Sequence, residues 1–259
     1  MPGSRWCADT MKHREFRRIC PDADTAVLFI HGINGTPNHF HDLVKLVPAE
    51  CSVVNVRLKG HGGSVRDFAN TSMEEWRAQI DEVVEALLEH HKNLLIVGHS
   101  MGTLFAIRQA IKHPDKVDGL FLLAVPLKLS VKPRAIRTSL KVSLGKVKEG
   151  DVWTQAAVSC YGIEPDRRFW RYIPWIKRYL ELFREIRDVK GQLAALRTPC
   201  YCYQSKKDEL VSMKACGILR GNKYAAVRVL ENSGHYYYDE KDYAGLLGDF
   251  RSFIREFTK

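Results

Sequence analysis

The pentapeptide Gly98-His99-Ser100-Met101-Gly102 places a hydroxyl group between an apolar run and a helix-forming segment. The run at residues 93–97 is typical of a buried parallel strand, and residues 103–112 predict a helix. A G-x-S-x-G sequence between a strand and a helix indicates a nucleophile elbow, a tight turn that exposes the serine hydroxyl. Gly98 and Gly102 are then needed because a Cβ would collide with the adjoining strand or helix.

A serine hydroxyl attacks a carbonyl group only when a base removes its proton and a third group orients that base. Two residues downstream fit these roles. Asp208 follows the strand expected at residues 201–204, and His235 follows the strand expected at residues 226–230. Because parallel strands end at the same edge of a sheet, both side chains are expected near Ser100. Glu209, next to Asp208, is the alternative acid.

The same chemistry needs donors for the negative charge that develops on a carbonyl oxygen. One expected donor is the backbone N–H of Met101, the residue after the serine. The other is expected from the loop at residues 31–33, through the N–H of Ile33. His31, His61 and His99 precede the downstream strands, so they are interpreted as residues that shape loops or form hydrogen bonds.

Strands and helices alternate on both sides of a different middle segment. We expect strands at residues 25–30, 52–58, 93–97, 117–125, 201–204 and 226–230. We expect helices at residues 37–47, 72–88, 103–112, 212–219 and 241–257. This alternation predicts an α/β fold, with a mostly parallel central sheet and helices on both faces. Residues 1–126 and 191–259 form the expected core, and residues 127–190 a helical cap inserted into it.

The chain resembles the α/β-hydrolase superfamily, and within it small bacterial carboxylesterases and monoacylglycerol lipases. The resemblance rests on four stretches: HGINGTP at residues 31–37, LKGHGGS with the downstream TSMEEWRAQI, GHSMG at residues 98–102, and KDELV followed by SGH. It implies a cofactor-free ester hydrolase with a cap over an acyl pocket. It also implies a catalytic triad of Ser100, Asp208 and His235. The insert itself matches the family poorly.

The net charge of +10 is concentrated in the insert, where residues 127–190 contain 15 Lys or Arg and 7 Asp or Glu. Cations and aromatic residues alternate at residues 167–178. A lid over an acyl pocket, with substrate-binding residues inside the insert, is one interpretation of this pattern. Docking on anionic lipid is another, compatible with the first. No nucleic-acid-binding motif accompanies the charge, so nucleic acid is not an expected partner.

Composition indicates the cellular location of the protein and whether it needs a metal or cofactor. No run of about 18 apolar residues is present, so no membrane-spanning helix is expected. The basic first twenty residues lack the apolar core of a secretory signal. The odd number of cysteines, seven, with no C-x-x-C spacing, suggests free thiols in a reducing compartment, and the cytoplasm is the expected location. The histidines do not show metal-ligand spacing, and no metal or cofactor is expected.

These observations predict a serine esterase acting on acyl esters, monoacylglycerols among them. A thioesterase, an amidase or an acyltransferase with the same triad is an alternative. A non-catalytic α/β-hydrolase that only binds its ligand is another. The sequence does not determine the acyl chain, the alcohol or the oligomeric state.

Overall fold

The computed structural model describes residues 13–143 and 146–258. Predictions that involve residues 1–12, Cys7 among them, lie outside the described residues. Within the described residues, seven strands form the main sheet, in the order β1-β3-β2-β5-β6-β8-β9. Their bounds are β1 (Phe16–Arg18), β2 (Thr25–Ile30), β3 (Ser52–Val56), β5 (Asn93–His99), β6 (Val117–Leu123), β8 (Cys200–Ser205) and β9 (Ala225–Leu230).

Every neighbouring pair in this sheet is parallel except β1 and β3. β5 is the central strand of the seven. The chain proceeds outward from β2 toward β3 on one side and from β5 toward β9 on the other. The order of strands therefore reverses between β2 and β5, and ligands of open α/β sheets bind in the crevice at such a point.

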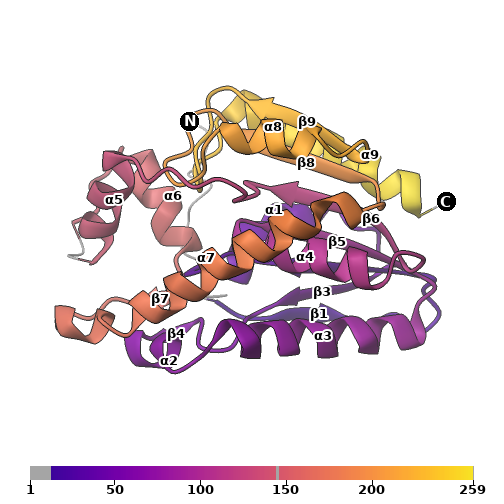
Figure 1. Cartoon of the computed structure of the whole chain (residues 1–259), viewed down its shortest axis with the longest axis horizontal. Coiled ribbons are helices and arrows are strands. Elements are labelled where there is room, and N and C mark those ends of the chain that lie inside the picture. The colour runs from indigo at the N-terminus through magenta and orange to yellow at the C-terminus, as the bar shows by residue number, and fades with distance from the viewer. Residues whose placement is uncertain (1–12, 144–145, 259) are drawn as a thin grey trace.

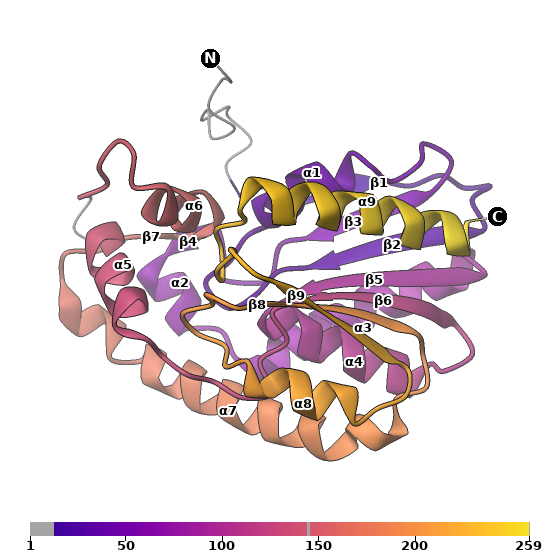
Figure 2. The same ribbon diagram turned by 90° about the horizontal axis from the view of Figure 1, so that it is seen from above.

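Helices cover both faces of the sheet (Figures 1 and 2). One face carries η1 (Pro37–Phe40), α1 (His41–Val44) and α9 (Glu240–Phe257). The other carries α2 (Val65–Ala69), α3 (Met73–His90), α4 (Met101–Lys112) and α8 (Lys214–Arg220). β5 serves both cores, because Leu94 and Ile96 face one and Leu95 and Val97 face the other. Burial on both faces explains its continuous apolar run.

The described residues between β6 and β8 contribute no strand to the main sheet. They contain α5 (Pro133–Ser143), α6 (Val152–Cys160), β7 (Ile163–Glu164), η2 (Phe169–Tyr172), α7 (Trp175–Gln192) and η3 (Leu193–Ala195). β7 pairs in parallel with β4 (Gly63–Ser64) in a separate two-stranded sheet. Figures 1 and 2 show α5, α6, β7 and the start of α7 at one end of the molecule, beyond the carboxyl ends of the main strands.

The predicted fold class is confirmed, and most predicted elements occur within two residues of their expected ends. The helix expected at residues 37–47 is shorter, because α1 ends at Val44 and Leu46 N–H then donates to the Leu43 carbonyl in a tighter turn. The insert, expected to be helical, consists mainly of helices and also contains the two-residue strand β7. α7 continues to Gln192, two residues past the expected end of the insert. The short elements β1, β4 and α2 were not predicted.

No helix within the described residues combines the length and apolar character that a bilayer crossing requires. The described cysteines form no disulfide, and all but Cys20 are buried. Cys200 and Cys202 are both buried in β8, where they pack as small apolar side chains.

Candidate active site

Ser100 lies in a strained turn between β5 and α4. Its φ of 51° and ψ of −122° are rare for a residue with a Cβ, and such a conformation persists only where surrounding bonds hold it. Three bonds do so. Ser100 N–H donates to the Leu123 carbonyl of β6 at 2.9 Å, and the Ser100 carbonyl accepts from Thr103 N–H at 3.0 Å and Thr103 Oγ1 at 2.6 Å.

The two glycines of the pentapeptide permit close approach of the backbone, as predicted. A Cβ at Gly98 would lie 2.8 Å from Thr103 Cα of α4. A Cβ at Gly102 would collide with the Ile30 carbonyl of β2. The first contact is with the helix and the second is with a strand, so the turn is tight on both sides.

Asp208 and His235 meet at the carboxyl ends of β8 and β9. His235 Nδ1 lies 2.9 Å from Asp208 Oδ2, and each residue is only 1% exposed. Asp208 Oδ1 accepts from the N–H groups of Leu210 at 2.7 Å and Val211 at 2.8 Å. Burial lowers the pKa of His235. The charge and hydrogen bond of Asp208, together with the charge of Glu209, raise this pKa by more than burial lowers it. The pKa of His235 is therefore above its ordinary value.

The adjacent acid, Glu209, occupies a different position. Its Oε2 accepts from the backbone N–H of His235 at 3.2 Å, and its side chain is buried. Asp208 therefore contacts the imidazole, whereas Glu209 holds the backbone that carries it. Sequence spacing left both acids open, because neighbouring residues in a loop can each reach the same partner.

The loop at residues 31–35 passes beside Ser100. A Cβ at Gly32 would lie 2.8 Å from Ser100 Cβ. The Gly32 carbonyl accepts from Gly35 N–H at 3.0 Å and from His31 Nδ1 at 2.9 Å. These bonds fix the Gly32–Ile33 peptide plane, and in a trans peptide the N–H of Ile33 points opposite to that carbonyl. The N–H of Met101, at the start of α4, has no intrahelical acceptor.

The arrangement agrees with a family match. Residues 21–237 match the family model described as "Serine aminopeptidase, S33", which covers over four-fifths of the chain. The chain belongs to this family of α/β-hydrolases.

Curated relatives of this α/β-hydrolase include lipases and esterases. The Thermostable monoacylglycerol lipase of Bacillus sp. (strain H-257) is 31% identical over 115 residues, 44% of each chain. A pimeloyl-[acyl-carrier protein] methyl ester esterase of Neisseria meningitidis is 36% identical over 117 residues, 44% of this chain and 42% of that protein. The matches thus span less than half the length of these relatives.

A solved structure of the metagenome-derived lipolytic enzymes LipS and LipT shares the fold, with a TM-score of 0.72 and 20% identity. It covers 95% of this chain and 98% of the solved one.

The hydrolase contains two further histidines around the site, the buried His99 and the partly buried His39. His99 Nε2 donates to the His235 carbonyl at 3.0 Å, and the ring of His39 stacks on that of His99 with centroids 3.7 Å apart. Burial lowers the pKa of His39 to about 3 and that of His99 well below its usual value, so both rings are neutral near pH 7. Sequence reasoning missed His39 of η1, since a lone histidine in a short helical segment carries no pattern.

His31 and His61 adopt the loop-shaping positions expected of them. His31 Nδ1 donates to the Gly32 carbonyl, and its Nε2 accepts from Leu58 N–H at 3.1 Å. Burial lowers the pKa of His31 to about 4, which keeps Nε2 available as an acceptor. The ring of His61 packs edge-on against that of His31, with centroids 4.8 Å apart. In the described part of the chain, no three His, Cys, Asp or Glu side chains converge as metal ligands would.

The insert of this hydrolase touches the loops that carry the site. Trp153 of α6 packs so closely on Gly234 that a Cβ there would collide with its ring. Tyr179 of α7 accepts through Oη from Asn34 Nδ2 at 2.7 Å, next to Ile33. None of these contacts was predicted, because the sequence pattern gives no pairing between segments so far apart.

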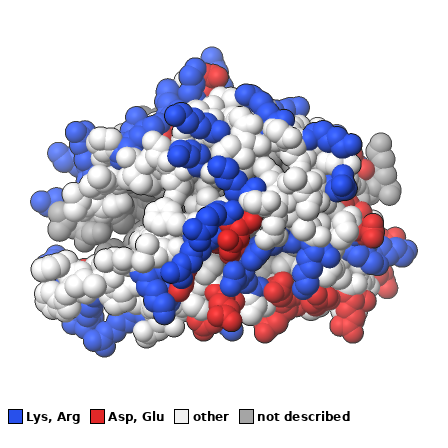
Figure 3. Space-filling model, in the orientation of Figure 1, with Lys and Arg blue, Asp and Glu red and all other residues white. Residues whose placement is uncertain are grey.

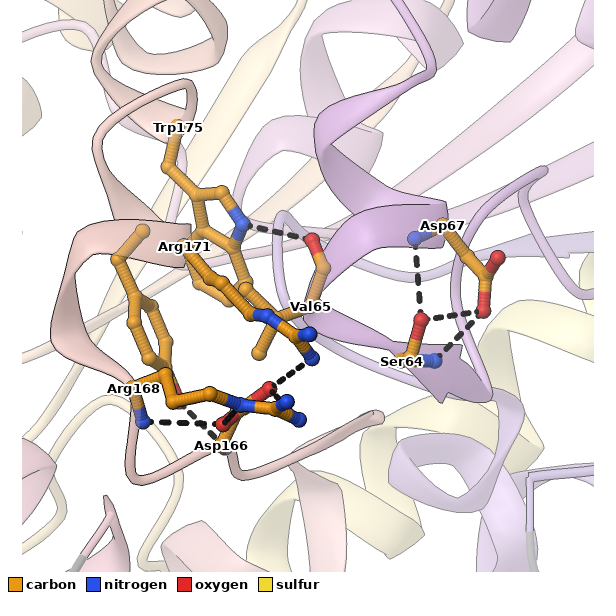
Figure 4. Close-up of polar contacts among 8 residues, drawn as sticks. Ser64, Val65, Asp67, Asp166, Arg168, Arg171 and Trp175 are labelled. Atoms are coloured by element: carbon orange, nitrogen blue, oxygen red, sulfur yellow. Dashed lines mark hydrogen bonds and ion pairs between the residues drawn. The ribbon is translucent and has the colours of Figure 1, made fainter.

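Two buried contacts fix α7 to the core. Glu185 accepts a hydrogen bond from Arg77 of α3 at 3.0 Å and forms an ion pair with Arg108 of α4 at 2.8 Å, and its side chain is 1% exposed. Trp175 Nε1 donates to the Val65 carbonyl at the start of α2 at 3.0 Å, as Figure 4 shows. Removal of either contact would loosen the insert from the sheet.

Proposed function

We propose that this hydrolase is a serine esterase that cleaves carboxylic esters, monoacylglycerols among them, through Ser100, His235 and Asp208. The observation that carries the proposal is the pairing of a strained, positive-φ Ser100 with a buried Asp208–His235 hydrogen bond at the same edge of the sheet. A strained backbone at one serine between a strand and a helix is typical of a nucleophile, because the turn exposes the hydroxyl that attacks the carbonyl group.

The reaction follows from these groups. The ring nitrogen of His235 opposite Asp208 removes the proton from Ser100 Oγ, which bonds to the ester carbonyl carbon. The N–H groups of Ile33 and Met101 hold the oxyanion. The tetrahedral intermediate expels the alcohol, which takes the proton from His235. Water, activated by the same imidazole, then breaks the acyl–serine bond and releases the acid. Asp208 holds the imidazole tautomer and stabilises the imidazolium.

The names of two relatives favour an ester as the substrate of this chain. The Bacillus protein is a monoacylglycerol lipase and the Neisseria protein a methyl ester esterase by name. Residues 127–190 are proposed to act as the cap over the acyl pocket, because Trp153 and Tyr179 reach the His235 and Ile33 loops. The family description, a serine aminopeptidase, supports amide hydrolysis as a second candidate for the same triad.

A fluorophosphonate probe tests the nucleophile. Wild-type protein is expected to form one adduct, found by mass spectrometry on the peptide containing Ser100, and Ser100→Ala to form none. Ser159→Ala, in α6 of the insert, is a matched control that should label normally. An unlabelled wild type, or equal labelling of Ser100→Ala, would refute the serine mechanism.

A substrate series separates the ester and amide candidates. Initial rates on p-nitrophenyl esters of increasing chain length, on a monoacylglycerol and on an aminoacyl p-nitroanilide should be measured together. Rates on esters that greatly exceed those on the anilide support the esterase. The reverse order, in protein that labels at Ser100, would assign the site to amide hydrolysis instead.

A further inference from the structure

Exposed apolar side chains are concentrated in the insert. Among the described residues, Ile19 is the only large apolar side chain outside residues 127–190 that is exposed. Six of those inside belong to η2, α7 and the short turn between them, and each is more than half exposed. We call them the outer stripe: Phe169, Trp170, Ile173, Ile176, Leu180 and Phe183.

The outer stripe follows one side of α7, and a different side of the same helix is buried. Ile173, Ile176, Leu180 and Phe183 recur at intervals of three and four residues, which places them on one face. Buried Trp175, Leu182, Ile186 and Val189 pack α7 against the core. A surface helix ordinarily has polar residues opposite its buried face. α7 instead has a second apolar face that faces water.

Cations accompany the outer stripe. Lys177, Arg184 and Arg187 are exposed on α7 and lie within four residues of its apolar members. Figure 3 shows Lys and Arg gathered in a diagonal band over α7, with uncharged surface to its upper left, whereas most Asp and Glu in this view gather below it over α3. A helix that combines exposed Trp, Phe and Leu with Lys and Arg is suited to the boundary between lipid headgroups and acyl chains.

The turn that carries Phe169 and Trp170 is braced from within. Asp166 accepts from Arg168 Nε at 2.9 Å and Arg168 Nη2 at 3.0 Å, and also binds Arg171 (Figure 4). Its own N–H donates to Tyr172 Oη at 3.0 Å. These bonds on both sides of the turn hold the two exposed aromatic residues at its tip without burying them.

We propose that the outer stripe docks this protein on an anionic lipid surface. The apolar residues would enter the headgroup boundary, and Lys177, Arg184 and Arg187 would contact lipid phosphates. A second copy of the chain is a poorer occupant. In a two-fold dimer the same patch would face itself, so the cationic residues of both copies would be brought together.

Docking would also place the site beside the surface. Tyr179, which directly precedes Leu180 of the outer stripe, binds Asn34 in the loop of Ile33. The helix that we propose to contact lipid thus also contacts the loop that carries Ile33. Loading of acyl esters from the membrane rests on the proposed function, whereas docking itself does not.

Vesicle co-sedimentation tests the docking. Vesicles of phosphatidylcholine alone are compared with vesicles containing about one-third phosphatidylglycerol, at low and high salt. Wild type should bind the anionic vesicles about tenfold or more tightly than the neutral ones, and salt should weaken binding. The triple variant Ile176→Ser, Leu180→Ser, Phe183→Ser and the double variant Lys177→Glu, Arg184→Glu should each lose most of this binding.

Matched controls separate docking from folding and from catalysis. Ile19→Ser removes an exposed apolar residue outside the insert, and Arg251→Glu reverses an exposed cation on α9, on the opposite face of the sheet (Figure 2). Both should bind as wild type does. The two stripe variants and these two controls should each keep their Tm and their rate on a short water-soluble ester. Ser100→Ala should bind vesicles normally while failing to hydrolyse, so failure of the proposed function is distinguishable.

Two outcomes would overturn the proposal. One is equal vesicle binding by wild type and both stripe variants. The other is that light scattering finds wild type to be a dimer and the triple variant to be a monomer, which would assign the outer stripe to contact with a second copy of the chain.

Discussion

Trp153 of α6 packs on Gly234, the residue directly before His235. The ring also lies against Tyr237, with centroids 4.6 Å apart, and Arg134 of α5 lies 4.2 Å from its centroid. Only a glycine fits at position 234, since a Cβ would collide with the ring. The insert therefore rests on the loop that carries the imidazole, and its position and that of His235 are coupled.

Replacing Trp153 tests this coupling. Trp153→Ala should destabilise the protein by about 2 kcal/mol, because it removes aromatic and cation–π contacts. It should also lower kcat on short soluble esters, since the His235 loop loses its support. Thermal unfolding and steady-state kinetics measure the two effects. Trp170→Ala, in the same insert but 55% exposed, should change neither value. Equal behaviour of the two variants would contradict the coupling.

The pH dependence of kcat/KM tests the proposed base. His235 must be neutral to take the proton from Ser100, and its pKa lies above the ordinary 6.5. Activity should therefore fall as the pH drops through a midpoint above 6.5. Glu209→Gln removes a charge that raises this pKa but keeps an acceptor for His235 N–H, so the midpoint should move to lower pH.

Asp208→Asn serves as the contrasting variant in the same experiment. It should lower kcat by about 10⁴-fold, because an amide does not hold the required imidazole tautomer. Glu231→Gln, an exposed acid outside the site, should leave both midpoint and rate unchanged. If Glu209→Gln abolished activity and Asp208→Asn retained it, the assignment of the acid would be reversed.

His99 is expected to position the His235 loop rather than to react. His99→Phe keeps a ring that can stack on His39 but removes the donor to the buried His235 carbonyl. An unpaired buried carbonyl costs about 1–3 kcal/mol, so stability should fall by that order and kcat by about tenfold. His99→Gln, which can still donate, should recover part of both. Denaturant unfolding with parallel kinetics provides the measurement, and an unchanged His99→Phe would contradict the role.

The glycine contacts predict opposite effects at two positions. Gly102→Ala should prevent folding or cost several kcal/mol, because its Cβ has no space beside the Ile30 carbonyl. Gly248→Ala, inside α9 with no atom within 4 Å of the new Cβ, should instead stabilise the protein by about 0.5–1 kcal/mol. Urea unfolding of both variants measures whether each substitution lowers or raises the free energy of unfolding. Tolerance of Gly102→Ala would show that the elbow is looser than its geometry indicates.

Local sequence determined the elements of the core and the residues of the proposed triad. The β5 strand is a continuous apolar run because it is buried on both faces, and the elbow after it needs glycine on both sides of Ser100. The order of strands along a parallel sheet then brings the loops of Asp208 and His235 to the same edge. These features depend on near neighbours in the chain, so the pattern of residue types is sufficient to predict them.

Tertiary structure alone decided how the insert relates to the site. α7 has apolar residues on two faces, and its periodicity does not tell which face meets the core and which meets water. Other contacts also join distant segments. They are the different contacts of Asp208 and Glu209 with His235, the stack of His39 on His99, and the contacts of Trp153 and Tyr179. Such contacts depend on the path of the chain through space, which residue spacing does not specify.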